Sequence, residues 1–362
     1  MHYKGQLITF APNRVWRSYV GGKTLDGLQN VEEPTDSHFP EEWIASTVRA
    51  VNPDRESHVE GISTALISSQ DTDFAALIQS DPDYFLGPKH TKKYTKNPMV
   101  LVKYLDSSVR LHFQAHPTAK FAKQHLNSNS GKAEAYYILD IREDVSDPYI
   151  YLGFQNPPSR EDFKEMIENQ DMEKIESCFK KIPVKPNDCF FIPGGMPHAI
   201  GEGILMIEVM EPSDWAVRFE FEKSGYTLPE EARFMKRGLD FCLDVFDYTQ
   251  YTPEYIKEHF QQKAQKITQY NDHSYKESLV GSQATDRFRI CKSTIKGNVQ
   301  KVEDEFFIGV ITKGSCTIKT GTESLTLSQY DTFFCPYGLE EFTITSSDGV
   351  EIIECYPPLS DE

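Results

Sequence analysis

Two stretches of this chain repeat one another, and the repeat restricts the fold more than any other feature. "DCFFIPGGMPHAI" (188–200) and "DTFFCPYGLEEFT" (331–343) align without gaps, and Asp, Phe, Phe, Pro and Gly recur at the same offsets. Each copy reads as a strand, a turn with Pro and Gly, and a second strand. Such self-similarity indicates two copies of one β unit. Many short strands separated by Gly and Pro turns favour a mainly β protein with two jelly-roll barrels.

Further strands are expected from apolar runs that are rich in Tyr, Ile and Val. The run before residue 117 predicts a hairpin, with strands Met99–Leu105 and Val109–His116 around a turn at 106–108. Two more strands are predicted within 133–141 and 148–154, and a short helix within 118–126.

A small helical insertion is predicted at about 157–182. Ser159 followed by Asp162 is a helix-start signal. Apolar residues then recur at helical spacing in two groups, which indicates a pair of packed helices rather than a cofactor site. The segment 228–246 also reads as helical, and the polar segment at about 250–285 reads as the connection to the last β region.

The two repeats predict two domains, of which only the first is expected to bind a metal. We expect a metal-binding domain over 1–245, which contains the helical insertion, and a degenerate C-terminal domain over 246–362. At the offset of His198 the second copy has Glu341, and no His occurs from Gly281 to the end of the chain. A metal held by the first copy is therefore not expected in the second.

Charge and cysteine content restrict the partners and the compartment. The 362 residues carry a formal charge of −17, with 38 basic and 55 acidic residues and no basic block. This balance argues against nucleic acid and anionic membranes as partners, whereas a small anionic substrate needs only a few local cations. Seven scattered Cys without a Cys-x-x-Cys pattern favour reduced thiols, and no signal peptide or membrane-spanning run is apparent. We expect a cytoplasmic protein.

The segment "RLHFQAHPTAKFA" (110–122) puts unexpected polar groups on a strand that otherwise looks buried. Side chains of a strand alternate between its faces, so His112, Gln114 and His116 are predicted to share one face. Glu134 and His198 follow at the starts of other predicted strands. Gln114, His116, Glu134 and His198 make a mixed nitrogen and oxygen set that suits zinc or another divalent metal. The alternative to a metal site is that His116 is a hydrogen-bonded core residue and that His198 is a surface residue beside a turn.

The same segments together resemble the class I mannose-6-phosphate isomerases, a family of the cupin superfamily. The motifs are Gln-x-His-Pro at 114–117, Gly-Lys-x-Glu at 131–134 and Pro-x-Gly-x-x-His-Ala-Ile-Gly at 193–201. The segment "FPEEWIAST" (39–47) is similar to an early Glu-x-Trp segment of the family, and the resemblance spans at least 98–220. The last region is similar to the degenerate second cupin domain of short bacterial members.

The resemblance implies a zinc-dependent aldose–ketose isomerase that interconverts mannose 6-phosphate and fructose 6-phosphate through an enediol. It implies that Gln114, His116, Glu134 and His198 bind the zinc. It also implies that Arg218, Glu208 and Lys132 are catalytic, and that Lys103, Lys132 and Arg218 contact the substrate. We expect His112 to contact the substrate as well, because it shares the face of Gln114 and His116.

The residue types agree with these roles, although each has a simpler interpretation. Proton transfer between two carbons needs a base, for which Glu208 is the candidate, and Arg218 can stabilise negative charge. Instead, Glu208 can be a carboxylate that orients a neighbour, and Arg218 can form a structural ion pair. Lys132 can be a solvated turn residue, and Lys103 can be a charge at a strand edge.

One departure from the family pattern concerns the substrate. His112 stands where the family commonly has Ser, two residues before the motif Gln. The imidazole can narrow the pocket, act as another metal ligand or, when protonated, bind phosphate. Three other functions therefore stay open: a cupin isomerase of a different or unphosphorylated sugar, a sugar-binding cupin without catalysis, and an iron-dependent dioxygenase. The dioxygenase is the weakest, because such sites are usually richer in imidazole.

Overall fold

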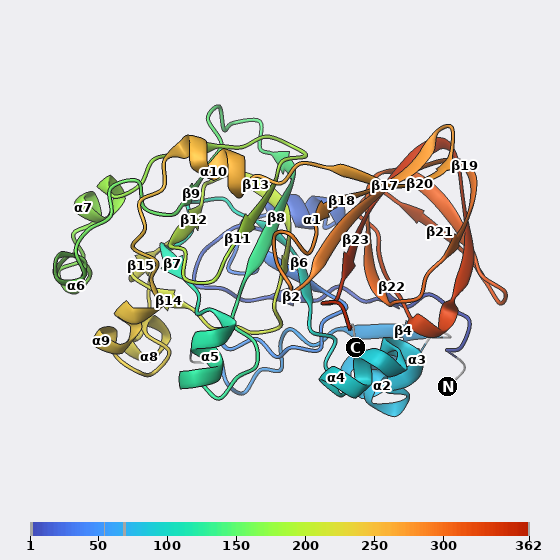
Figure 1. Cartoon of the computed structure of the whole chain (residues 1–362), viewed down its shortest axis with the longest axis horizontal. Helices are drawn as coiled ribbons and strands as arrows, with labels where there is room; N and C mark the ends of the chain where they lie inside the picture. The colour runs from blue at the N-terminus through green and yellow to red at the C-terminus, as the bar shows by residue number, and fades with distance from the viewer. Residues whose placement is uncertain (1–2, 54, 68–69, 361–362) are drawn as a thin grey trace.

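The computed structural model describes residues 3–53, 55–67 and 70–360. Strands dominate both halves of the molecule (Figure 1), which confirms the prediction of a mainly β fold. Within the described residues, no helix is both long and apolar enough to cross a membrane.

The first half contains two sheets whose inner faces meet. The six-stranded sheet has the order β11-β8-β13-β6-β3-β2, and the five-stranded sheet has the order β10-β9-β12-β7-β14. The strands of the six-stranded sheet are β2 (Arg14–Val15), β3 (Glu41–Ile44), β6 (Leu101–Asp106), β8 (Glu134–Ile141), β11 (Cys189–Ile192) and β13 (Ile204–Met210). Those of the other sheet are β7 (Gln114–Ala115), β9 (Tyr149–Leu152), β10 (Ile182–Pro183), β12 (His198–Ile200) and β14 (Val217–Arg218).

The second half is one seven-stranded sheet, on the right of Figure 1. Its long strands β19 and β23 pair from Arg289↔Tyr356 to Val302↔Glu341, with a register shift that bends them midway. The strands are β17 (Gln265–Asn271), β18 (Ser274–Val280), β19 (Arg289–Val302), β20 (Phe307–Lys319), β21 (Ser324–Ser328), β22 (Thr332–Cys335) and β23 (Glu341–Tyr356).

Two small sheets and several short helices complete the chain. The small sheets contain β1 (Thr9–Phe10), β4 (Thr64–Ile67) and β5 (Gln70–Asp73), and β15 (Glu222–Lys223) and β16 (Tyr226–Thr227). The helices are α1 (Lys23–Leu28), α2 (Phe74–Ser80), α3 (Pro82–Leu86), α4 (Pro88–Tyr94), α5 (Ala119–His125), α6 (Arg160–Glu168), α7 (Met172–Ser177), α8 (Glu230–Arg233), α9 (Leu239–Cys242), η1 (Leu243–Val245), α10 (Pro253–His259) and η2 (Tyr337–Leu339).

The repeat is visible in the backbone. The strands β11 and β22 begin at the same offset in the two copies, and so do β12, at His198, and β23, at Glu341. A shared core joins the halves, since Val102 and Ile207 of the first half belong to one buried cluster with Phe334 and Ile353 of the second. The domain boundary at 245/246 stays a prediction.

The predicted helical insertion is confirmed. Helices α6 and α7 lie together at the far left of Figure 1, and the Ser159 hydroxyl caps α6 by accepting the Asp162 N–H. Buried Phe163 and Ile175 face the aromatic core of the five-stranded sheet. The predicted helix within 118–126 is also confirmed as α5.

Two sequence predictions about local structure were wrong, and a third was confirmed only in part. Residues 99–116 are not a hairpin, because β6 and β7 belong to different sheets and the intervening chain crosses between them. The Ser107 side chain donates to Gly201 O at this crossing. The segment 250–285 is not a simple connection, since it contains β17 and β18. The polar, exposed side chains of β17 suit its place at the sheet edge, and β18 lies between β17 and β19. The segment 228–246 forms only short, interrupted helices.

Candidate metal centre and active site

The five-stranded sheet brings three predicted site residues into one row. Gln114 of β7 pairs with His198 of β12 on one side and with Arg218 of β14 on the other. Residues directly opposite one another in neighbouring strands project from the same face of a sheet. The row therefore places the Gln114 amide between an imidazole and a guanidinium.

The six-stranded sheet presents a second row from the opposite side. Glu208 of β13 pairs with Tyr136 of β8 and with Lys103 of β6. Glu134 lies two residues before Tyr136 on the same strand, so both side chains project from the same face. A carboxylate of this sheet thereby faces the imidazoles of the other.

His116, Glu134 and His198 form a buried group of three candidate metal ligands. One donor atom from each lies within 4.8 Å of the other two. The His198 Nε2–Glu134 Oε1 distance is 3.1 Å, and the His116 Nε2–Glu134 Oε2 distance is 3.4 Å. All three side chains are buried. The structure thus brings together three of the four predicted ligands.

Backbone carbonyls orient both imidazoles. His116 Nδ1 donates to Trp215 O at 2.7 Å, and His198 Nδ1 donates to Met196 O at 2.9 Å. A carbonyl only accepts, so each Nδ1 carries a proton, and Nε2 is the nitrogen of each ring that remains to bind a metal beside Glu134. Such partners of the remote ring nitrogen are typical of metal-binding histidines.

The charge states also suit a metal. Burial and the neighbouring Lys132 ammonium hold the pKa of His116 well below its usual range, so the imidazole is neutral. Burial opposes ionisation of Glu134, but Lys132 and the two imidazoles hold the pKa of this carboxyl well below its usual range. Neutral imidazole and ionised carboxylate are the forms that bind metals.

Two polar atoms in the group of His116, Glu134 and His198 lack hydrogen bonds, so they are free to bind a cation. Within the described residues, Glu134 Oε2 and His198 Nε2 are buried and have no hydrogen-bond partner. The Lys132 ammonium lies 3.0 Å from Glu134 Oε2 and 2.9 Å from His116 Nε2. Convergent lone pairs that already attract one cation fit a divalent metal with mixed nitrogen and oxygen ligands.

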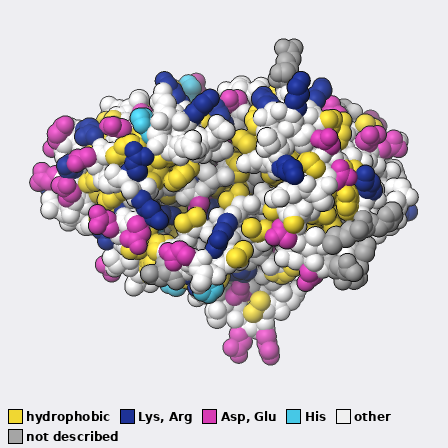
Figure 2. Space-filling view, turned by 90° about the horizontal axis from the view of Figure 1, so that it is seen from below, with side chains coloured by type: hydrophobic (Ala, Val, Ile, Leu, Met, Phe, Trp, Pro, Cys, Tyr) yellow, Lys and Arg dark blue, Asp and Glu magenta, His cyan; other side chains and the backbone are white. Residues whose placement is uncertain are grey.

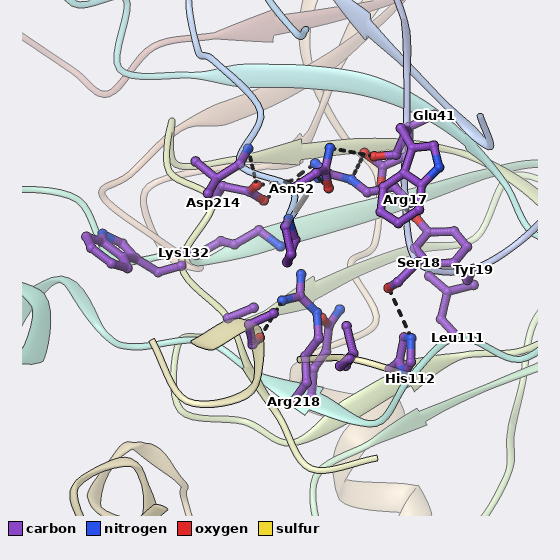
Figure 3. A pocket seen from close by; sticks show the side chains of 18 of the residues that line it. Arg17, Ser18, Tyr19, Glu41, Asn52, Leu111, His112, Lys132, Asp214 and Arg218 are labelled. Atoms are coloured by element: carbon purple, nitrogen blue, oxygen red, sulfur yellow. Dashed lines mark hydrogen bonds and ion pairs between the residues drawn. The ribbon is translucent and has the colours of Figure 1, made fainter. Parts of the chain in front are cut away.

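Figure 3 shows a cavity of about 360 Å³ that is lined in part by Lys132, which contacts both His116 and Glu134. Its size is within the range of small-molecule sites. All six of the other predicted site residues line it: Lys103, His112, Gln114, Lys132, Glu208 and Arg218. Hydrophobic side chains, including Leu105, Leu111 and Ile200, line other parts of the wall.

A buried charge network supports the cavity wall, and sequence reasoning missed it. Glu41 accepts from Arg17 Nε at 3.0 Å and lies 3.2 Å from Lys103 Nζ. It also accepts from Trp43 Nε1 and Tyr19 Oη. The sequence signal was the Glu-x-Trp pattern at 41–43, which was noted only as part of the resemblance. Its Glu is the centre of the network.

The same network sets the protonation of Glu208. Burial raises the pKa of Glu208 to about 7; Lys103 opposes this shift and the negative charge of Glu134 adds to it. Lys103 Nζ lies 3.0 Å from Glu208 Oε2, and Lys132 Nζ lies 3.7 Å from Oε1. A carboxyl that titrates near neutrality is suited to proton transfer. Neither lysine is a solvated or strand-edge charge, because both are buried.

Arg218 is partly buried and differs from the buried cations Arg17, Lys103 and Lys132. Its Nη1 donates to Ala232 O at 3.0 Å, and none of the ion pairs within the described residues involves Arg218. Burial lowers its pKa, and the guanidinium stays charged because its ordinary value is far above neutrality. The alternative of a structural ion pair therefore does not apply in the described part of the chain.

His112 lies outside the strand that carries Gln114, contrary to the prediction of one long strand. Its Nδ1 donates to Glu220 O at 3.0 Å, and its Nε2 lies 3.1 Å from Ser18 Oγ. Burial and Arg218 lower its pKa to about 4, so the imidazole is neutral at neutral pH. Both ring nitrogens have protein partners.

The chain is similar in sequence to a curated protein over about two thirds of its length. The chain is 26% identical over 247 residues to "Mannose-6-phosphate isomerase ManA" of Bacillus subtilis (strain 168), which covers 68% of this chain and 71% of that relative. No protein-family model matches the chain.

Solved structures share the fold over nearly the whole length. The mannose 6-phosphate isomerase from Bacillus subtilis superposes with a TM-score of 0.73 at 21% identity, covering 97% of this chain and 99% of that one. A zinc-bound mannose 6-phosphate isomerase superposes with a TM-score of 0.69 at 13% identity, covering 98% and 100%. The predicted resemblance to this group of proteins is thus confirmed.

Proposed function

We propose that this chain is a metal-dependent mannose-6-phosphate isomerase, which converts the aldose into fructose 6-phosphate. The observation that carries the proposal is the position of His116, Glu134 and His198. They lie next to Lys132 and Gln114, which line a cavity together with Glu208 and Arg218. The group supplies two imidazoles and a carboxylate for a divalent ion, and the cavity adds a carboxyl whose pKa is raised to about 7. The name of the Bacillus subtilis relative supports the choice of reaction.

Gln114, His116, Glu134 and His198 would hold the ion, for which zinc is the first choice. The donor set suits zinc, and one of the structurally similar proteins is zinc-bound. Gln114 enters the set because its strand pairs with that of His198, and because its side chain lines the cavity. When bound, zinc supplies a Lewis acid that polarises sugar oxygens.

Glu208 is the group that we assign to proton transfer. As a carboxylate it takes the proton from C2 of the aldose while O1 gains a proton, which gives the enediol; it then returns its proton to C1 while O2 loses one, so that the hydroxyl proton moves in net terms from O2 to O1. Its pKa of about 7 leaves a substantial fraction ionised at neutral pH. Lys103 holds one carboxylate oxygen at 3.0 Å and so limits its orientation.

Arg218 and Lys132 are assigned to the negative charge that develops on the substrate oxygens. Arg218 has no carboxylate partner among the described residues, and its guanidinium therefore remains available to an anion in the cavity. Lys132 can donate a hydrogen bond to a sugar oxygen. Fixed cations in a site that excludes water stabilise an oxyanion strongly.

A phosphorylated substrate is compatible with the acidic composition of the chain. Figure 2 shows basic side chains among acidic ones over one face, so cations are present locally despite the net charge of −17. Lys236 lines the cavity, is exposed to solvent and has no ion pair within the described residues, so it is available to a phosphate group. Free mannose carries no negative charge for this cation to bind.

A cytoplasmic location also belongs to the proposal. All seven cysteines are unpaired and buried, which suits a reducing compartment.

The test is a substrate panel measured with zinc-loaded protein. We expect fructose 6-phosphate from mannose 6-phosphate, and much slower turnover of free mannose and of other aldose 6-phosphates. Fast turnover of an unphosphorylated sugar would contradict the proposal and would identify the protein as an isomerase of that sugar. Saturable sugar binding without any turnover would identify a binding protein instead.

A further inference from the structure

Ser18 and His112 meet at the wall of the cavity, although they come from distant parts of the chain. Both side chains line the cavity and both are largely buried. The distance between Ser18 Oγ and His112 Nε2 is 3.1 Å, and Figure 3 draws the contact beside Arg218. Neither the proposed metal set nor the proposed proton transfer uses this pair.

The direction of the hydrogen bond follows from the other partner of His112. Nδ1 faces the backbone carbonyl of Glu220 at 3.0 Å, and a carbonyl can only accept. The ring is buried and its two nitrogens contact only uncharged groups, the Glu220 carbonyl and the Ser18 hydroxyl. Burial without a carboxylate partner favours the uncharged ring, which therefore carries its proton on Nδ1 and has only a lone pair on Nε2. The Ser18 hydroxyl must donate its proton to Nε2.

The backbone on both sides of the pair is held in place. The Glu220 carboxylate accepts from Arg110 and from the Phe113 N–H, next to His112. Arg17, next to Ser18, donates its backbone N–H to His38 O at 2.8 Å, and its side chain is held by Glu41. The orientation of the hydroxyl is thus fixed before any ligand arrives.

This orientation restricts what Ser18 can do toward a ligand. A hydroxyl has one proton and two lone pairs, and the proton is already used by His112. Within the described residues, His112 is the one hydrogen-bond partner of the Ser18 hydroxyl. The oxygen can therefore accept a hydrogen bond from a ligand hydroxyl, whereas a phosphate dianion has no proton to offer it.

We propose that Ser18 is a specificity residue that accepts a hydrogen bond from a sugar hydroxyl, and that His112 is the positioning residue that turns the Ser18 oxygen toward the substrate. The proposal rests on the proposed function for the identity of the sugar. It also gives His112 a role other than obstruction of the pocket.

The experiment compares wild type and Ser18→Ala on mannose 6-phosphate and on its 3-deoxy and 4-deoxy analogues. Loss of one hydrogen bond to the substrate should lower kcat/KM about tenfold, mainly through KM. For the analogue that lacks the partner hydroxyl, the ratio of wild type to variant should fall to about one. Ser46→Ala, at a buried serine outside the cavity lining, is the matched control.

The role of His112 is tested by a double-mutant cycle. His112→Asn keeps a donor for Glu220 O but is too short to accept from Ser18, and His112→Phe removes both functions. Each should lower kcat/KM in the wild type and should have no further effect in Ser18→Ala. Additive losses would overturn the positioning role.

Two results would overturn the role of Ser18. Unchanged kinetics of Ser18→Ala would show that the hydroxyl does not contact the substrate. An equal loss for every deoxy analogue would assign it a merely structural role. If the wild type bound these sugars without turnover, the proposed isomerase function would fail. The role of Ser18 would then be tested by the dissociation constants of wild type and Ser18→Ala for the same sugars.

Discussion

Glu208 and Lys103 face one another across the neighbouring strands β13 and β6, with 3.0 Å between the carboxylate Oε2 and the ammonium Nζ. Lys103 also lies 3.2 Å from Glu41, which is itself bound by Arg17. Burial opposes the charge of Lys103, but Glu208 and Glu41 raise its pKa above the usual range. A permanently charged lysine therefore holds the proposed base in one position.

Glu208→Gln should lower kcat by about 100- to 10,000-fold, because the amide cannot take a proton. In the wild type, activity should rise as the pH increases through about 7, since the pKa of Glu208 is raised to about 7 and only the ionised form is a base. A pH–rate profile of both proteins checks this. An unchanged kcat in the variant would assign the proton transfer to another group.

Arg218→Lys should lower kcat by about 100-fold or more and should change KM less. Lysine keeps the charge, but it cannot donate to Ala232 O and to a substrate oxygen in the same planar geometry. Steady-state kinetics on mannose 6-phosphate separate the two constants. A change in KM alone would mean that Arg218 binds the substrate without stabilising developing charge.

His198→Gln should weaken zinc binding by more than about 100-fold, because it removes a ligand. Removal of only the hydrogen-bond partner of a ligand typically weakens metal binding by about 10- to 100-fold. Competition with a chelator measures the affinity, and the rise in melting temperature on addition of zinc gives a second readout. His90→Gln is the matched control, because His90 is equally buried but lies on α4 and contacts Asn97 O. Equal affinities in the two variants would place the metal elsewhere.

Phe163→Ala should destabilise the protein by about 3–5 kcal/mol, through loss of a large side chain from a packed core. The Phe163 ring is fully buried, with its centroid 5.3 Å from that of Phe154 and 5.0 Å from that of Phe246. Denaturant unfolding measures the difference, and Tyr255→Ala, at a 43% exposed site, is the control. Similar free energies of unfolding for both variants would show that the helical insertion does not contribute to the core.

The candidate metal ligands were the part of the site that the sequence predicted most readily. Alternation along one short strand selected Gln114 and His116, and the gapless repeat placed His198 at the start of a strand. These features are local. The packing of the insertion was likewise predictable, because the helical spacing of Phe163 and Ile167 reports the buried face directly.

Features that depend on distant strands were not predictable. The hairpin at 99–116 looked plausible because both runs are apolar, but the chain crosses to the opposite sheet where Ser107 bonds Gly201 O. Glu41 gathers partners from residues 17, 19, 43 and 103, and no spacing rule relates them. The contact of Ser18 with His112 is of the same kind.

The most direct test of the account is a zinc titration of metal-free protein, with fructose 6-phosphate formation from mannose 6-phosphate as the readout. Activity should be absent at the start, rise in proportion to added zinc and level off at one zinc per chain. His116→Gln and Glu134→Gln should stay inactive over the same range. Full activity in protein shown by elemental analysis to be free of metal, or no activity with one zinc bound per chain, would contradict the account.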